Sequence, residues 1–286
     1  MDFYSDLALE AKDLSEKGYD EEEEDKAGFH VTRIDVKTKE GAKALGRDAG
    51  RYTTVDLPDY SLPADLFEKA VGVISEEITA LARLKKRDSV LIVGLGNAEI
   101  TPDSLGPFTL RRAVVTRHLK KTLPRFLSEG EFRDVSGLVP GVLGQTGIES
   151  LEITRSVVES VKPDAVILID SLAARTLSRL GRAVQISDRG LVPGGGVGNS
   201  RAEISEKTLG VRCLSIGVPT VMTAESLISR GRKKKSALTD AEASMIITPK
   251  DVCQMINECS RLIGCSLSAA LHYGMTLSEI SEWLRA

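Results

Sequence analysis

Residues 90–107 read Val90-Leu91-Ile92-Val93-Gly94-Leu95-Gly96-Asn97-Ala98-Glu99-Ile100-Thr101-Pro102-Asp103-Ser104-Leu105-Gly106-Pro107, and this stretch decides the fold. Its first four residues are apolar and three of them are β-branched, which predicts a buried strand. Gly94, Gly96 and Asn97 then favour a tight turn, and a second turn signal precedes a helical pattern. The stretch therefore brings one carboxylate, that of Asp103, to the strand-to-helix corner of an α/β unit. In open α/β sheets such corners are where ligands bind.

The composition is that of a globular protein with a sizeable core. The 286 residues carry a net charge of −3, and 42% of them are hydrophobic, so no basic field favours nucleic acid as a partner. No apolar run is long enough to span a bilayer, and the first residues lack the features of a secretory signal. The four cysteines show no C-x-x-C spacing, which argues against disulfides or a zinc site. We expect a cytoplasmic protein whose partners include neither a membrane nor nucleic acid directly.

Strand and helix patterns alternate along the chain. Apolar patterns predict further strands at residues 30–36, 51–57, 135–139, 164–170, 183–186 and 211–218. Helical patterns cover residues 66–81, 105–123, 148–161, 224–229, the segment that follows a Thr248 N-cap, and 277–284. This order predicts an α/β fold with a mostly parallel central sheet flanked by helices, additional N-terminal strands at about 29–60 and C-terminal helices at about 248–286. The acidic run 21–25 is expected to be a solvated loop or, alternatively, an inhibitory segment over a basic surface.

The glycines of the opening stretch also invite comparison with a dinucleotide-binding loop, but the fingerprint is incomplete. Glu99 occupies the position of the third glycine, and Thr101-Pro102 prevents a helix from beginning at once. An acidic side chain there would repel a pyrophosphate. A nucleotide site is therefore disfavoured.

A pair of carboxylates is the better hypothesis. Asp103 and Asp170 each follow a predicted core strand, and parallel strands end at the same edge of a sheet, so the two side chains could meet there. Two close carboxyl groups share a proton, which lets one activate water while the other polarises a carbonyl. For each Asp taken alone, capping of the next helix or turn remains the alternative. A shared proton would make the reaction faster at mildly acidic pH than at neutrality.

Other kinds of site have less support in the sequence. His30, His118 and His272 lie away from both aspartates, and there is no H-E-x-x-H motif, so we predict no metal and no cofactor. Ser171 follows Asp170 but lacks the G-x-S-x-G setting of a nucleophile. Three polar residues are expected to line the crevice: Asn97, Ser171 and Asn199.

Several motifs of this chain resemble those of the germination protease family of spore-forming Firmicutes. They are Val93–Asn97 with Thr101–Pro107, Leu168–Ala173, Pro193–Asn199, His30–Val36 with Glu40–Gly46, Met222–Ala224 and Ile247–Asp251. The motifs occur in order along nearly the whole chain. The resemblance is therefore specific.

The resemblance implies a fold similar to that of the hydrogenase maturation proteases and an endopeptidase activity. The family degrades small acid-soluble proteins that protect spore DNA, and its two catalytic aspartates fall on Asp103 and Asp170. It is made as a zymogen that trims its own N-terminus after an acidic residue. Ser5–Asp13 is similar to that processing region, which puts the cut between Asp6 and Leu7.

Further expectations follow from the same resemblance. Residues 1–6 would be a propeptide and residues 7–286 a single peptidase domain, which acts in the cytoplasm of the spore core as a homotetramer. Hydrogenase maturation proteases use a histidine as well as acids to bind metal, and the chain has no convincing counterpart for it, so a metal-free pair is favoured. Two alternatives stay open: a metal-dependent protease of the hydrogenase-maturation type, and a non-catalytic α/β module whose glycine loops bind a small anion.

Overall fold

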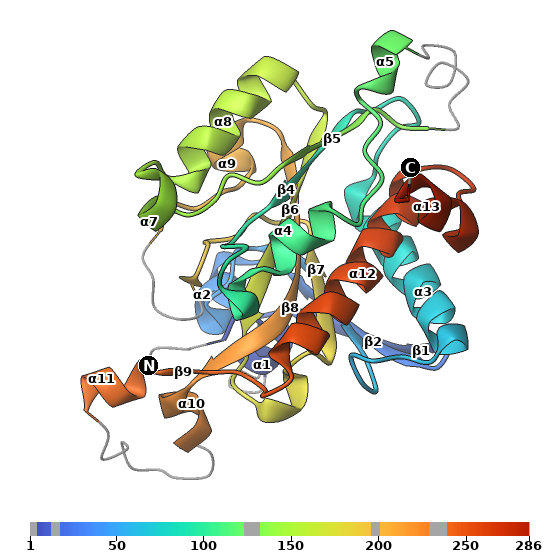
Figure 1. Cartoon of the computed structure of the whole chain (residues 1–286). Coiled ribbons are helices and arrows are strands. Elements are labelled where there is room, and N and C mark those ends of the chain that lie inside the picture. The colour runs from blue at the N-terminus through green and yellow to red at the C-terminus, as the bar shows by residue number, and fades with distance from the viewer. Residues whose placement is uncertain (1–4, 13–17, 123–131, 196–200, 229–238, 286) are drawn as a thin grey trace.

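The computed structural model describes residues 5–12, 18–122, 132–195, 201–228 and 239–285 (Figure 1). Over these residues the chain forms an α/β fold in which helices flank one large sheet, as the sequence predicts. The strands are β1 (Asp20–Lys26), β2 (Phe29–Val36), β3 (Gly50–Asp56), β4 (Val90–Gly94), β5 (Val135–Leu138), β6 (Ala165–Ala173), β7 (Ala183–Ser187), β8 (Arg212–Thr223) and β9 (Ile246–Ile247).

Helices occupy most of the segments between the strands. They are α1 (Ala8–Lys12), α2 (Lys39–Leu45), α3 (Ala64–Ala82), α4 (Leu105–Leu110), α5 (Leu119–Thr122), α7 (Leu143–Thr146), α8 (Ser150–Val161), α9 (Glu206–Leu209), α10 (Ala224–Ile228), α11 (Asp240–Ala243), α12 (Val252–Leu271) and α13 (Leu277–Trp283), with short 3₁₀ turns η1 (Thr101–Asp103) and η2 (Leu177–Arg179). None of the helices in the described ranges combines the length and apolar character that a membrane crossing requires.

One half of the sheet is parallel and the other half is antiparallel. Its strand order is β1-β2-β3-β7-β8-β6-β4-β5, and β9 pairs with β8. Neighbours among β8, β6, β4 and β5 run parallel, whereas β1, β2, β3 and β7 join through antiparallel pairs. The N-terminal strands therefore extend the central sheet itself, because β3 pairs with β7.

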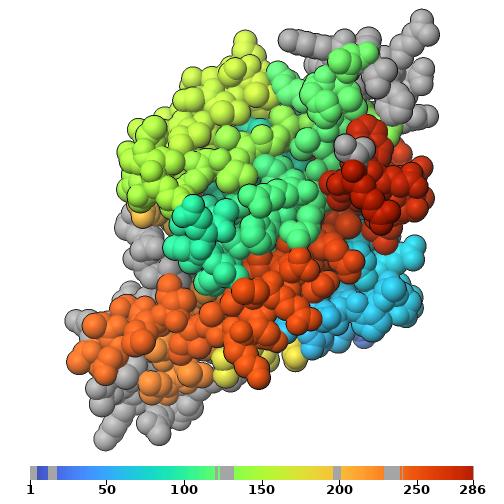
Figure 2. Space-filling model, in the orientation of Figure 1, coloured from blue at the N-terminus to red at the C-terminus, as the bar shows by residue number. Residues whose placement is uncertain are grey.

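Apolar side chains cover both faces of the central strands. On one face α3 and α12 contribute a large cluster that includes Ile74, Ile78, Ile256 and Ile263, and Figure 2 shows α12 filling the surface between α4 and α3. On the other face α8 and α9 pack over β4 and β6. Burial on both faces explains why β4 and β6 have continuous rather than alternating apolar sequences.

The acidic run is a strand, so the expectation of a solvated loop is wrong. Residues 20–26 form β1 at the edge of the sheet, where they pair with β2. Arg33 of β2 binds Glu24 at 2.9 Å across the strands and Glu77 of α3 at 3.0 Å. These carboxylates raise the pKa of Arg33 further. Cross-strand cations therefore offset the repulsion within the acidic strand.

Two predicted helix boundaries are also wrong. The helix expected over 105–123 stops at Leu110, because the chain near Thr116 pairs instead with β5: the backbone N–H groups of Thr116 and Arg117 both donate to Val135 O at 2.9 Å. Thr248 does not cap the long C-terminal helix, which begins at Val252. Its hydroxyl donates to Thr220 O at 2.9 Å and so ties the approach to α12 onto β8.

Candidate active site

Asp103 lies at the corner that the opening stretch predicts. β4 ends at Gly94, and the chain then turns at Gly96, whose φ is +102°. A Cβ on Gly96 would overlap the backbone oxygen of Asp103, so only glycine lets the two segments approach this closely. The Asn97 N–H donates to Asp103 Oδ2 at 2.9 Å and holds the carboxyl group in place.

The sequence predicts that Asp170 ends its strand, but in the structure Asp170 lies within β6. β6 extends three residues further, to Ala173, and outruns β4, whose last residue, Gly94, pairs with Ile169. Asp170 is 5% exposed, and its Oδ1 accepts the Ser171 N–H at 2.9 Å. Opposite it on β8 is Gly217, where a Cβ would lie 2.8 Å from the Asp170 backbone oxygen. The site thus opens where β6 loses β4 as a neighbour.

The two carboxyl groups have unequal affinities for protons. Burial raises the pKa of Asp103 to about 6, against the opposing effect of the Asn97 N–H. Burial raises the pKa of Asp170 well above its ordinary value, and the charges of Asp103 and Asp6 raise it further. Asp170 therefore has the higher proton affinity of the two, because the charge of Asp103 adds to the effect of its own burial.

The N-terminal segment, residues 5–11, lies against the end of β6. Asp6 and Ala173 exchange two hydrogen bonds: the Asp6 N–H donates to Ala173 O at 2.8 Å, and the Ala173 N–H donates to Asp6 Oδ2 at 2.8 Å. Leu7 is fully buried among Leu172, Ala174, Leu180 and Met222. The predicted cleavage residues are thus adjacent to β6, three residues beyond Asp170 along that strand.

Gln185 of β7 spans the Asp6–Leu7 peptide bond. Its Nε2 donates to Asp6 O at 2.9 Å, and its Oε1 accepts the Ala8 N–H at 2.7 Å. Both arms of one amide therefore bind the main chain on either side of Leu7. Gln185 does not stand out in the sequence as a site residue. The sequence feature that could have identified Gln185 is its position as a lone amide inside the apolar strand Ala183–Ile186, where its side chain is buried.

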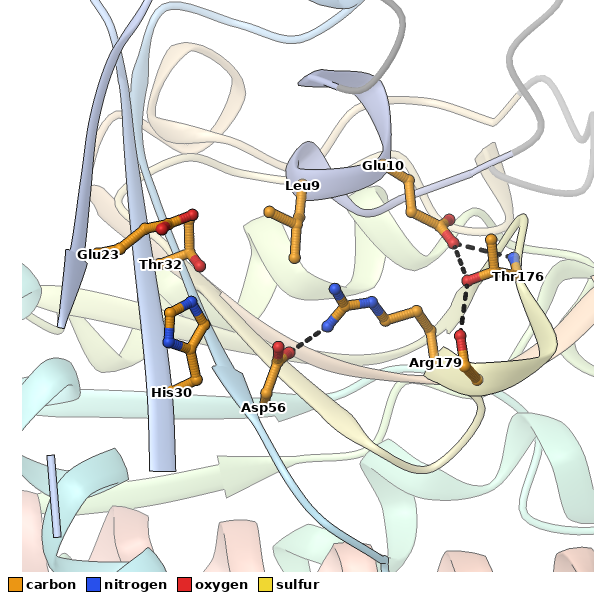
Figure 3. Close-up of a pocket in the computed structure, with 9 residues that line it drawn as sticks. Leu9, Glu10, Glu23, His30, Thr32, Asp56, Thr176 and Arg179 are labelled. Carbon is orange, nitrogen blue, oxygen red and sulfur yellow. Dashed lines mark hydrogen bonds and ion pairs between the residues drawn. The ribbon is translucent and has the colours of Figure 1, made fainter. Parts of the chain in front are cut away.

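Glu10 anchors the segment beyond the predicted cut. Its carboxylate accepts the backbone N–H of Arg175 at 2.6 Å. It also accepts the Thr176 N–H at 2.9 Å and the Thr176 hydroxyl at 2.7 Å (Figure 3). Ser5 Oγ donates to the same carboxylate at 2.5 Å. Four donors thus satisfy a carboxylate on a residue that is 3% exposed.

Two cavities flank the N-terminal segment. One of about 630 Å³ is lined by Asp170, Gln185, Ser5 and Asp6, among other residues. The other, of about 330 Å³, is lined by Leu9 and Glu10 together with Thr176 and by the ion pair of Arg179 with Asp56 (Figure 3). The segment therefore runs from the cavity beside Asp170 to the cavity beside Thr176.

The three residues expected along the crevice have different surroundings. Asn97 is buried beside Asp103, and its Oδ1 accepts the Glu99 N–H and the Gln145 side-chain amide, each at 2.9 Å. Ser171 Oγ is buried with no hydrogen-bond partner among the described residues, and alternation along β6 turns it away from the Asp170 side. Asn199 lies outside the residues that the structure describes.

His30 and His272 bind residues other than Asp103 and Asp170. His30 binds Asp25 at 2.9 Å on the outer strands, and buried His272 contacts Val114 O at 3.0 Å. In the described parts of the chain, no group of three His, Cys, Asp or Glu side chains has an arrangement that could hold a metal ion.

Comparisons with known proteins converge on one family. A family model described as germination protease matches residues 5–232. The germination protease of Clostridium perfringens strain SM101 is 34% identical, with 98% of each chain covered. That of Caldanaerobacter subterraneus is 38% identical over 98% of this chain and 97% of the relative, and that of Bacillus velezensis is 44% identical over 79% and 64%.

Among solved structures, a hydrogenase maturation protease from Thermococcus kodakarensis aligns with 67% of this chain and 98% of its own, at 17% identity. The TM-score of 0.37 is too low to establish a shared fold. The sequence relatives need no such support, because they align over nearly the full length of the chain. The chain belongs to the germination protease family, and the protein is a peptidase.

Proposed function

We propose that this chain is a self-processing endopeptidase that degrades small acid-soluble spore proteins in the spore core during germination. Asp103 and Asp170 are its catalytic residues. The observation that carries the proposal is the position of buried Asp170: it lines one cavity together with Asp6, and the charges of Asp103 and Asp6 both raise its pKa. Family membership supports a germination endopeptidase in general.

In this mechanism the ionised Asp103 takes a proton from water, and the resulting hydroxide attacks the scissile carbonyl carbon. Protonated Asp170 donates its proton to the carbonyl oxygen as that oxygen becomes negative. As the tetrahedral intermediate collapses and its C–N bond breaks, one of its hydroxyl groups returns a proton to Asp170, and the leaving nitrogen takes the proton that Asp103 had removed from water. One water is consumed, and one acid and one amine are formed.

Self-processing is supported by the position of the N-terminal segment. The carbonyl of Asp6 is already bound by Gln185, and the Asp6 charge acts on Asp170. Ser5 and Asp6 also line the cavity beside Asp170. A propeptide of six residues can therefore inhibit by occupying the crevice, without any separate inhibitory domain.

The test replaces each aspartate. Asp103→Asn and Asp170→Asn are each expected to slow self-trimming, and cleavage of a purified small acid-soluble spore protein, by a factor on the order of 10³ or more. Asp164→Asn, which alters an exposed Asp at the opposite end of β6, is the matched control and should trim normally. Normal trimming by either active-site variant would show that the pair does not perform the reaction.

The same assay distinguishes the two alternatives. Cleavage that a chelator abolishes, and added metal restores, would indicate a metal-dependent protease. If trimmed protein cleaves no substrate, the non-catalytic binding module would be the interpretation that remains. Sedimentation tests the proposed homotetramer, whose mass should be near four times the chain mass of 30.8 kDa.

A further inference from the structure

Strand β8 has one residue more than its neighbour β6 near the carboxyl ends of the two strands. Leu172 of β6 pairs with Pro219, but the next residue, Ala173, pairs with Val221. Thr220 is therefore the extra residue of a β-bulge. Bulges are rare between parallel strands, and they occur next to active sites, where they re-aim a side chain.

The bulge reverses the alternation of side chains along β8. Before it, Ile216 and Val218 pack in the large apolar cluster on the α12 side of the sheet. In an unbroken strand Met222 would face the same side as Val218, but it packs with Leu172 in a separate cluster. Thr220 lies at the reversal, and its side chain is fully buried.

Thr220 binds the turn η1 that carries Asp103. Its hydroxyl donates to Pro102 O at 2.7 Å, on the residue immediately before Asp103. Other hydrogen bonds of this turn are local, such as that from the Asp103 N–H to Ile100 O at 2.8 Å. Local bonds fix the shape of the turn. The Thr220 hydroxyl fixes the place of the turn against β8, and hence against β6, the strand of Asp170.

A second hydroxyl binds Thr220 from the other side. The Thr248 hydroxyl donates to Thr220 O at 2.9 Å, four residues before α12 begins at Val252. The extra residue of a bulge is left unpaired in the ladder, so its carbonyl needs a partner from elsewhere. The two hydroxyl groups thus connect the approach to α12 with the turn of Asp103 through one buried residue of β8.

We infer that Thr220 is a positioning residue for the proposed reaction, because its hydroxyl sets the place of Asp103 relative to Asp170. Thr248 supports Thr220 in that role. The inference rests on the proposed function and adds to it a residue that acts through the backbone oxygen of Pro102. Misplacing a reacting group by about 1 Å can slow a reaction on the order of 10²-fold.

Loss of the Thr220 hydroxyl has a defined effect on Asp103. Pro102 O would lose its donor, and the turn would move outward until water replaced that donor. Asp103 would move with the turn and become more hydrated. Because burial raises the pKa of Asp103 to about 6, hydration should lower that pKa. The rate of trimming rises as Asp103 ionises, so its acid limb should move to lower pH.

The experiment follows self-trimming of the full chain between about pH 4 and 9. Thr220→Val removes the hydroxyl and keeps the shape of the side chain. It should slow trimming at pH 7 on the order of 10²-fold and lower the pH of half-maximal rate by about one unit. Thr220→Ser keeps the hydroxyl, so it should stay within about threefold of the wild type and keep the wild-type pH profile.

Thr53→Val is the matched control. Thr53 is a buried residue of β3 whose hydroxyl has no hydrogen-bond partner among the residues that the structure describes. The same chemical change there breaks no such contact, so the rate and its pH profile should remain those of the wild type. Thr248→Val should shift the profile in the same direction as Thr220→Val but less, and it carries the test if Thr220→Val does not fold.

The pH profile separates positioning from a merely structural role. A structural role would lower the folded fraction, which circular dichroism measures at each pH. Rates divided by that fraction would then keep the wild-type half-maximal pH. An unchanged half-maximal pH in both Thr220→Val and Thr248→Val would overturn the inference. So would equal losses in Thr220→Ser and Thr220→Val, because the hydroxyl would then have no special part.

The aspartate variants keep this inference separate from the proposed function. If Asp103→Asn or Asp170→Asn trims normally, the proposed function fails. If both stop trimming while Thr220→Val trims as the wild type does, the proposed function stands and only the role of Thr220 is refuted.

Discussion

At the scale of single residues, the fold changes the pKa values of the Asp103 and Asp170 carboxyl groups. Their carboxyl groups lie where burial disfavours the charged form, and the pair is close enough for one charge to hold the proton on the other. Because the pKa of Asp103 is about 6, the rate of self-trimming should be half-maximal near pH 6, higher at neutrality, and lower again at higher pH as Asp170 loses its proton. This prediction replaces the expectation from the sequence that the reaction is faster at mildly acidic pH than at neutrality. Timed electrophoresis of the full chain across pH 4–9 measures this profile, and a flat profile would contradict it.

The same pKa shift affects stability. The folded-state pKa of Asp103 lies above the unfolded value of about 3.9, so its penalty is absent below about pH 4 and complete above about pH 6. Asp103→Asn should therefore raise the free energy of unfolding at pH 7, by at most about 3 kcal/mol, and leave it unchanged at pH 4.

Urea unfolding at the two pH values checks this stability effect. Asp164 provides a control of opposite sign, because hydrogen bonds from Ser89 lower its pKa. Asp164→Asn should lose stability at neutral pH and lose less as the pH falls. A stabilising effect of Asp103→Asn at pH 4 would point to a cause other than charge.

At the scale of elements, the corner between β4 and α4 depends on backbone packed against backbone. A Cβ on Gly106 would lie 2.5 Å from Leu95 N and 2.6 Å from Ile169 O, which are backbone atoms that cannot move aside. Gly106→Ala should therefore lower the free energy of unfolding by about 1–3 kcal/mol and displace Asp103, with loss of trimming. Gly72→Ala is the matched control: a Cβ there meets nothing within 4 Å, so it should stabilise α3 by about 0.5–1 kcal/mol. Thermal melts with a trimming assay compare the two.

The elements that the sequence predicts correctly are those whose burial follows from the pattern of apolar residues within the element itself. The continuous apolar runs of β4 and β6, and the turn at Gly96, could be recognised without knowing their partners. The acidic strand β1 could not be recognised in this way. Its carboxylates are bound across the sheet by Arg33 of β2, which in turn binds Glu77 of the distant helix α3. Similarly, the residues near Thr116 have a helical sequence pattern but hydrogen-bond to Val135 of β5 instead of forming a helix. Gln185 was missed because its role depends on a segment far away in sequence.

At the scale of the whole molecule, the N-terminal segment belongs to both the fold and the site. Leu7, Leu9 and Ala11 are buried, so trimming after Asp6 should change the melting temperature little. A chain that begins at Asp13 would lose these contacts and should be less stable by about 3–6 kcal/mol, since two leucines at 1.5–3 kcal/mol each leave the core. Urea unfolding of the two truncated chains measures the difference. Equal stability would mean that the segment does not support the fold.

The charge of Asp6 on Asp170 has a consequence for the mature enzyme. The proposed trimming would remove that charge, so the trimmed chain should release the Asp170 proton at lower pH than the full chain does. A bound substrate with an acidic residue before the cut would return a negative charge to the same place and help to keep Asp170, the proposed acid, protonated. The alkaline limb of kcat should therefore lie at higher pH than that of kcat/KM, because only kcat reports the complex. Catalysis would then be substrate-assisted: the peptide to be cut would bring part of the acid catalyst's tuning with it.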